Sequence, residues 1–163
     1  MRTRTLTIAP VLLLVAACSA ATPSTRATWS DGSAEPPAAS VDARLVEVYK
    51  SPTCSCCHEW EAYLRANRFT VRSIPTENMA AVKAEYGIGP EAASCHTAVV
   101  DGYAVEGHVP IEAIEDLLAR RPAIDGITLP GMPAGSPGMP GQKAGPFEIL
   151  AVDDGRTSAF GAY

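Results

Sequence analysis

Residues 49–60 read Tyr-Lys-Ser-Pro-Thr-Cys-Ser-Cys-Cys-His-Glu-Trp and place three cysteines and one histidine within five positions. The stretch follows an apolar run at 45–49 that is rich in β-branched residues, which predicts a buried strand. Beyond the cysteines, Trp60, Tyr63 and Leu64 have the i, i+3, i+4 spacing of a helix. The cysteines therefore lie where a strand gives way to the start of a helix.

The start of a helix favours thiol chemistry, because its unpaired backbone N–H groups and the positive end of its dipole stabilise a thiolate. Cys54 and Cys57 form a Cys-x-x-Cys pair, which can close a disulfide or share one metal ion. Cys56 adds a third thiol between them. A purely structural role, with two disulfides stapling an exported chain, is the alternative. It fits poorly, because a disulfide between the neighbours Cys56 and Cys57 would be strained and only Cys95 could act as a distant partner.

The rest of the chain predicts a mixed α/β fold. The alternating run at 69–74 predicts a second strand, and the turn Asp101-Gly102 between 97–100 and 103–105 predicts a hairpin. Apolar stripes predict helices over 57–67, over 79–86 with Asn78 as N-cap, and from 111 to a point before Pro122, after Pro110.

The resulting order is β-α-β-α-β-β-α, which is the thioredoxin-like arrangement, and a Cys-x-x-Cys at the opening of the first helix strengthens that prediction. One departure matters, because Ser94-Cys95-His96-Thr97 occupies the place where thioredoxins have a cis-proline.

The C-terminal part is an extension beyond that order. Residues 126–146 carry Gly and Pro at many positions, and we expect neither a helix nor a regular strand there, only a Pro/Gly-rich wrap. Residues 147–152 predict one more short strand, 153–155 predict its turn, and the end of the chain predicts an edge piece or a tail.

The N-terminus predicts export. Arg2 and Arg4 precede an apolar run that ends in small residues before Cys18, which is the pattern of a signal peptide over residues 1–17. Val15-Ala16-Ala17-Cys18 resembles the lipobox of bacterial lipoproteins, so we expect Cys18 to carry a lipid that anchors the protein to the inner or outer membrane. An ordinary signal peptide with a chance cysteine is the alternative.

Residues 18–43 are rich in Ala, Ser, Thr and Pro and predict a disordered tether, which leaves residues 44–163 as the domain. We therefore expect a periplasmic protein that meets the membrane only through its lipid.

The chain is acidic, with a formal net charge of −5, and it has no basic cluster. Nucleic-acid binding needs Lys and Arg to neutralise phosphates, so this class of partner is not expected. An acidic surface suits a soluble envelope protein or one that handles cations.

If the predicted fold is right, Cys95 and His96 arrive beside the opening of the first helix. Cys54, Cys56, Cys57 and Cys95 would then share one pocket with His58 and His96. Thiol–disulfide exchange needs only two sulfurs, whereas thiolates select soft metals such as Cu(I). Neighbouring cysteines cannot readily both point at one ion, but bridging thiolates on several Cu(I) ions tolerate such crowding.

Other candidate ligands are less specific. His58 could be a ligand, a partner of a ligand or an exposed residue of the first helical turn, and His108 could be a ligand or a loop histidine. Met132 and Met139 recur seven residues apart in Gly-Met-Pro settings and could offer thioether ligands to Cu(I). The interpretation we prefer for these methionines is that they fill gaps at the surface of the core.

Residues 45 to about 160 resemble the CopG-like family of bacterial copper-resistance proteins, long catalogued as a domain of unknown function. The matching stretches are residues 49–57, 79–83, 94–100, 102–103 with 106–110, and 130–133 with 135–139. The resemblance implies a thioredoxin-like periplasmic protein that holds a multinuclear Cu(I)–thiolate cluster, with interconversion of Cu(I) and Cu(II) as a further expectation. Cys54, Cys57 and Cys95 match its metal-binding cysteines, with Cys56 alongside.

Two functions follow as hypotheses. The first is a protein of copper resistance that binds Cu(I), with copper ions and other periplasmic copper-handling proteins as partners. The alternative is an envelope thiol–disulfide oxidoreductase in which Cys54 attacks and Cys57 resolves.

Overall fold

The structure is a computed structural model and describes residues 44–163. The predicted signal peptide, the lipidated Cys18 and the tether all lie outside these residues. No helix in the described part of the chain is long and apolar enough to cross a membrane.

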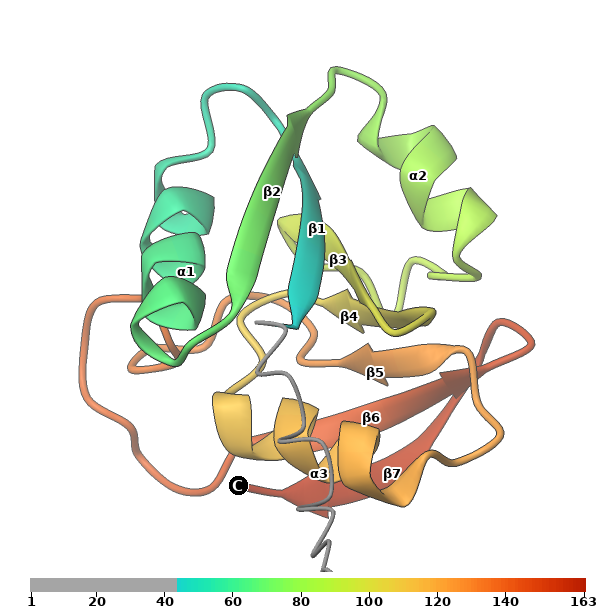
Figure 1. Ribbon diagram of the computed structural model, residues 1–163. Helices are drawn as coiled ribbons and strands as arrows, with labels where there is room; N and C mark the ends of the chain where they lie inside the picture. Colours follow the sequence, from blue (N-terminus) through green and yellow to red (C-terminus); the bar gives the residue numbers. More distant parts are fainter. Residues whose placement is uncertain (1–43) are drawn as a thin grey trace, which may run out of the picture. The chain divides into compact units, whose positions relative to one another are not determined.

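The described residues form a mixed α/β fold with a single seven-stranded sheet (Figure 1). Its strands lie in the order β2-β1-β3-β4-β5-β6-β7. The first seven elements are β1 (Leu45–Lys50), α1 (Ser55–Ala66), β2 (Thr70–Pro75), α2 (Met79–Glu85), β3 (His96–Val100), β4 (Tyr103–Glu106) and α3 (Ile111–Arg120). The predicted element order β-α-β-α-β-β-α is therefore confirmed, with Asn78 accepting the N-cap hydrogen bond from Ala81.

The pairing of the strands follows from the connections between them. β1 and β2 are parallel because α1 crosses over between them, whereas β3 runs antiparallel to both β1 and β4. The hairpin at Asp101-Gly102 has positive φ at both central residues, as a two-residue turn of the favoured type requires. This hairpin brings the residues before β3 opposite those after β4.

The prediction for residues 126–146 is wrong at its start, because β5 (Gly126–Thr128) is a strand between β4 and β6. A Cβ at position 126 would lie 2.1 Å from the carbonyl oxygen of Ala104, so only glycine allows this close pairing. A buried strand of three residues that opens with glycine is too short to show a period in the sequence.

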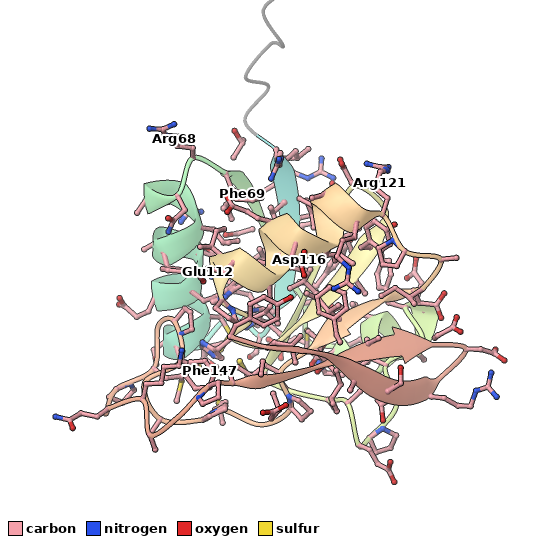
Figure 2. The ribbon with its side chains drawn as sticks, turned by 90° about the horizontal axis from the view of Figure 1, so that it is seen from below. Arg68, Phe69, Glu112, Asp116, Arg121 and Phe147 are labelled. Carbon is pink, nitrogen blue, oxygen red and sulfur yellow. A yellow bond between two sulfur atoms is a disulfide. The ribbon has the colours of Figure 1, made fainter. Side chains whose placement is uncertain are left out.

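The last two strands extend the sheet beyond the predicted core. β6 (Glu148–Asp153) confirms the predicted strand, and β7 (Arg156–Ala162) forms the outer edge. Tyr163 ties this end to α3, because its hydroxyl donates to Asp116 over 2.6 Å. Figure 2 labels Asp116 in the middle of that helix.

Two apolar clusters hold the layers together. The larger one joins α1 and α3 to the sheet and includes Trp60, Leu64, Ile114 and Leu117. A smaller cluster around Ile88 lies after α2. Figure 1 shows α1 and α2 on opposite sides of the β2–β1–β3 end of the sheet. Trp60 and Leu64 pack α1 into the larger cluster and so fix the helix that carries the cysteines.

Candidate metal centre

The first helical turn carries a closed disulfide between Cys54 and Cys57, whose Cα atoms are 5.4 Å apart. Cys54 is the N-cap residue of α1 and its backbone N–H donates to Ser51, so the turn at 51–53 sets where the helix begins. Cys57 is completely buried. The sequence left the disulfide pairing open, and the structure selects this pair, with Cys56 and Cys95 as free thiols.

The four predicted cysteines come together. Cys56 Sγ lies 3.5 Å from Cys54 Sγ and 4.0 Å from Cys95 Sγ. All four sulfur atoms lie within 4.8 Å of one another. Two sulfurs on one ion at about 2.3 Å each are at most about 4.6 Å apart, so the four sulfurs are close enough for metal ions to join them once the disulfide is reduced.

Two histidines face Cys95. His96 Nδ1 is 3.1 Å and His108 Nε2 is 3.0 Å from Cys95 Sγ, and these three residues form a second group of potential ligands. His108 Nδ1 donates to the carbonyl oxygen of Pro137 over 2.7 Å. Because that nitrogen carries the proton of a neutral ring, the lone pair of Nε2 is directed toward the sulfur.

Burial dominates the protonation of this group. Burial, and next the neighbouring Cys56, raises the pKa of the Cys95 thiol to about 12. Burial also lowers the pKa of His96 well below its ordinary value of 6.5, with His108, Lys83 and Lys50 adding to the effect. The pKa of His108 is lowered by burial as well, against the hydrogen bond to Pro137. Burial therefore favours the thiol form of Cys95 and the neutral forms of both imidazoles.

His58 lies apart from both groups. Its side chain is exposed, and its Nδ1 accepts a hydrogen bond from Lys50 Nζ over 2.7 Å. The structure thus brings His96 to the cysteines but leaves His58 on the surface, and it brings in His108, whose role the sequence left open.

A buried ion pair fixes the start of α1 to the sheet. Lys50 Nζ lies 2.9 Å from Glu61 Oε1, and the two side chains are 1% and 2% exposed. Burial would raise the pKa of Glu61, but hydrogen bonds from Ser73 and Lys50, and the charge of Lys50, outweigh it and lower that pKa. Lys50 thereby binds both Glu61 and His58 on the helix that carries the cysteines.

A second ion pair, between the partly exposed Lys83 and the buried Glu106, holds the segment that carries Cys95. Glu106 is completely buried and accepts from Lys83, from the backbone N–H of Ser94 over 2.5 Å and from Thr97 over 2.6 Å. Cys95 thus lies between Ser94 and Thr97, which both donate hydrogen bonds to the Glu106 carboxylate.

The Pro/Gly-rich segment after β5 passes over the site. Ser94 donates to the carbonyl of Gly131, and Pro137 accepts from His108. A Cβ on Gly138 would lie 2.7 Å from the backbone nitrogen of Trp60 and 3.2 Å from the carbonyl oxygen of Cys56, so this segment lies directly against the first turns of α1. In Figure 1 the segment is the long loop between β5 and β6.

The two methionines of this segment differ. Met132 is 52% exposed, so about half of its side chain stays in contact with solvent. Met139 is half-buried, which agrees with a packing role.

Sequence reasoning missed both ion pairs and the place of His108. The pairs gave no signal, because Lys50 and Glu106 look like ordinary polar residues at strand ends. His108 did give one. The two-residue turn sets the hairpin register, in which Thr97 pairs with Glu106, and continuing that register by two residues places Cys95 opposite His108.

Comparisons with known proteins show the family to which this chain belongs. The family described as "Protein of unknown function, DUF411" matches residues 92–139, which include Cys95, His96 and His108. Two solved structures named copper resistance protein CopG, forms 2 and 1, are similar to this chain with a TM-score of 0.68 and 37% identity. Each match covers 75% of this chain, and it covers 99% and 98% of the solved chains respectively. No curated protein matches the chain.

Proposed function

The chain belongs to the CopG-like family of copper-resistance proteins, and from this premise we propose that it binds several Cu(I) ions on the thiolates of Cys54, Cys56, Cys57 and Cys95. The observation that carries the proposal is the gathering of four cysteine sulfurs within 4.8 Å. Soft thiolates select Cu(I), and four of them in one place exceed what thiol exchange requires.

The spacing of the sulfurs supports more than one ion. Cys56 and Cys57 are neighbours in the helix, but Cys57 is buried and disulfide-bonded whereas Cys56 points toward Cys54 and Cys95. The sulfurs of both neighbours lie close to Cys54 Sγ, so thiolates shared between several ions can join all four cysteines. Reduction of the Cys54–Cys57 disulfide by an external dithiol, which delivers two electrons and two protons and is itself oxidised to a disulfide, makes all four thiols available.

The proposal extends to the setting of the protein. We place the protein in the bacterial periplasm, anchored through Cys18, where it would exchange copper with other copper-handling proteins. The observed strand order β2-β1-β3-β4, with β1 and β2 parallel and α1 and α2 on opposite sides of the sheet, supports a thioredoxin-like core. Interconversion of Cu(I) and Cu(II) belongs to the same proposal.

Anaerobic titration of the reduced chain with Cu(I), in competition with a chromogenic chelator, tests the proposal. We expect more than one ion per chain, and fewer ions for both Cys56→Ser and Cys95→Ser. His58→Ala is the matched control, because this histidine lies outside the cluster, and its stoichiometry should equal that of the wild type. One ion or none, with both serine variants silent, would refute the proposal.

One observation favours a second function. The Cys54–Cys57 disulfide is closed at the start of a helix, as in an envelope thiol–disulfide oxidoreductase. In that case Cys54→Ser should abolish reduction of insulin disulfides, whereas Cys95→Ser should leave it intact. Equal loss from both variants would point back to the metal site.

A further inference from the structure

Exposed arginines gather at the end of the fold that lies away from the metal centre. This basic end consists of Arg44, Arg65, Arg68, Arg120 and Arg121, whose side chains are all exposed. We propose that the basic end binds the anionic phospholipid surface of the membrane that anchors the protein, so that the cysteines face away from the bilayer. The inference rests on the lipid-anchored setting proposed above, but it does not depend on copper binding.

Contacts at the edge of the fold where β1 begins bring the arginines together. The Arg44 guanidinium lies 5.9 Å from the centre of the Phe69 ring, and Arg68 directly precedes that phenylalanine. Arg121 contacts Asp101 in the β3–β4 turn over 3.5 Å, and the end of β3 pairs with the start of β1. Figure 2 shows Arg68 and Arg121 along the same edge of the molecule. No basic run in the sequence indicates this end, because its arginines come from separate segments.

The helices α1 and α3 separate the basic end from the metal centre. α1 begins beside Cys54 and carries Arg65 in its last turn, and α3 begins shortly after His108 and ends with Arg120. Helices of 12 and 10 residues are about 18 and 15 Å long, which exceeds the Debye length of about 8 Å at physiological ionic strength. Acidic side chains near the metal centre therefore do little to weaken the attraction of the basic end for an anion.

The contacts within the fold do not account for all of these charges. Arg65 and Arg120 each bind an acidic residue one helical turn earlier. Arg44 and Arg68, in contrast, take part in none of the ion pairs among residues 44–163. Arg68 and Arg121 have positive φ, 66° and 46°, just after the ends of α1 and α3, where glycine or asparagine adopts the backbone with less strain. Neither position requires an arginine for the fold, so the charges point to an anionic partner.

The place of the basic end in the chain selects a membrane as that partner. Arg44 is the first residue that the structure describes, so the chain that leads from the proposed lipid at Cys18 joins the domain at this end. Leu45 beside it is 50% exposed, and an apolar side chain among arginines suits the boundary between lipid headgroups and acyl chains. An anchored protein meets the bilayer at a high effective concentration, so a few arginines are sufficient.

Arginine footprinting of the full chain in vesicles tests the proposal. The chain is reconstituted in phosphatidylcholine vesicles with or without phosphatidylglycerol and treated with phenylglyoxal, and each modified arginine is quantified by mass spectrometry. We expect phosphatidylglycerol to protect Arg44, Arg68 and Arg121. Salt at about 1 M, which shortens the Debye length to about 3 Å, should remove the protection. Arg156, which opens the edge strand β7 outside the basic end, should react equally on both kinds of vesicle.

A charge-removing variant gives the magnitude. One arginine near an anionic surface strengthens docking about fivefold, so Arg68→Gln should lower the ratio of protected to reactive Arg44 by about that factor. The matched control Arg156→Gln should leave this ratio unchanged. Arg68→Gln should also keep the Cu(I) stoichiometry of the wild type, since it lies at the far end of α1 from the cysteines.

The same vesicles separate the basic end from the anchor. Equal reactivity of Arg44, Arg68 and Arg121 with and without phosphatidylglycerol would overturn the proposal and leave an acidic protein as the kind of partner that fits this end. Recovery of the chain with the vesicles in high salt reports the anchor at Cys18 separately. Cu(I) titration of the reduced chain then shows whether the proposed function stands without this inference.

Discussion

The contact between the Pro/Gly-rich segment and α1 gives the sharpest test of how the site is enclosed. Gly131 and Gly138 occupy equivalent positions in the near-repeat Pro-Gly-Met-Pro, and both have positive φ, 71° and 79°. They differ in their surroundings. A Cβ at 131 would meet nothing within 4 Å, whereas a Cβ at 138 would lie 2.7 Å from the backbone nitrogen of Trp60.

The two alanine substitutions should therefore differ in magnitude. Alanine in the left-handed region costs about 1–2 kcal/mol, which is all that we expect for Gly131→Ala. Gly138→Ala adds a backbone clash that no flexible side chain can relieve, and overpacking of this kind costs about 1–3 kcal/mol more. At an m-value of about 2 kcal/mol per molar urea, the difference would separate the unfolding midpoints by about 0.5–1.5 M.

The site should respond in the same order. Relief of the clash at 138 must move the segment away from α1, which withdraws the Pro137 carbonyl from His108. We expect Cu(I) binding by the reduced chain to weaken in Gly138→Ala and to be retained in Gly131→Ala. Urea unfolding followed by circular dichroism, with Cu(I) titration of both reduced variants, measures the two effects. If the midpoints agree within about 0.2 M and binding is equal, the packing of this segment on α1 is refuted.

Three further predictions concern the buried polar groups. The pKa of His96 is lowered in the folded chain, so unfolding takes up a proton below pH 6.5. The free energy of unfolding should therefore fall as the pH falls, by at most about 1.4 kcal/mol per pH unit. His96→Gln should flatten this pH profile, and an unchanged slope would contradict the prediction. Lys50→Met leaves the buried Glu61 carboxylate without its main cation and should lower the free energy of unfolding by about 3–5 kcal/mol. The double variant Lys50→Met/Glu61→Leu should restore most of that loss. Purely additive losses in urea unfolding would show that the pair is not coupled. Glu106→Gln should lower the free energy of unfolding by about 2–5 kcal/mol. It should also speed hydrogen exchange of the Ser94 amide, because that amide donates to the Glu106 carboxylate. Unchanged exchange would exclude Glu106 as the residue that holds this segment.

The sequence predicted those elements of the fold that have a local signal, either a regular spacing of apolar residues or a characteristic turn. The apolar spacing after Cys57, the alternation over 69–74 and the turn at Asp101-Gly102 each have one local explanation, and the elements they predict are observed. β5 was missed because its place depends on close contact between Gly126 and the backbone of Ala104, which is not a local property.

The site was predictable to the extent that it depends on topology. The strand order brings Cys95 and His96 to the start of α1, and the hairpin register would also have placed His108 beside them. The buried partners of Lys50 and Glu106 were beyond reach, because a charged residue at a strand end is usually exposed and only packing decides otherwise. The choice of Cys54 and Cys57 as the disulfide pair likewise depended on which sulfurs the helix turn brings together.

If the four cysteine sulfurs form one copper site, copper should protect all four thiols at once. Metal content and free thiols should therefore be measured together on the full chain, purified without air and fully reduced. We expect more than one copper per chain, and protection from alkylation of Cys54, Cys56, Cys57 and Cys95 that is lost when a chelator removes the copper. Copper at one ion per chain or fewer, with these four thiols reacting freely in its presence, would contradict it.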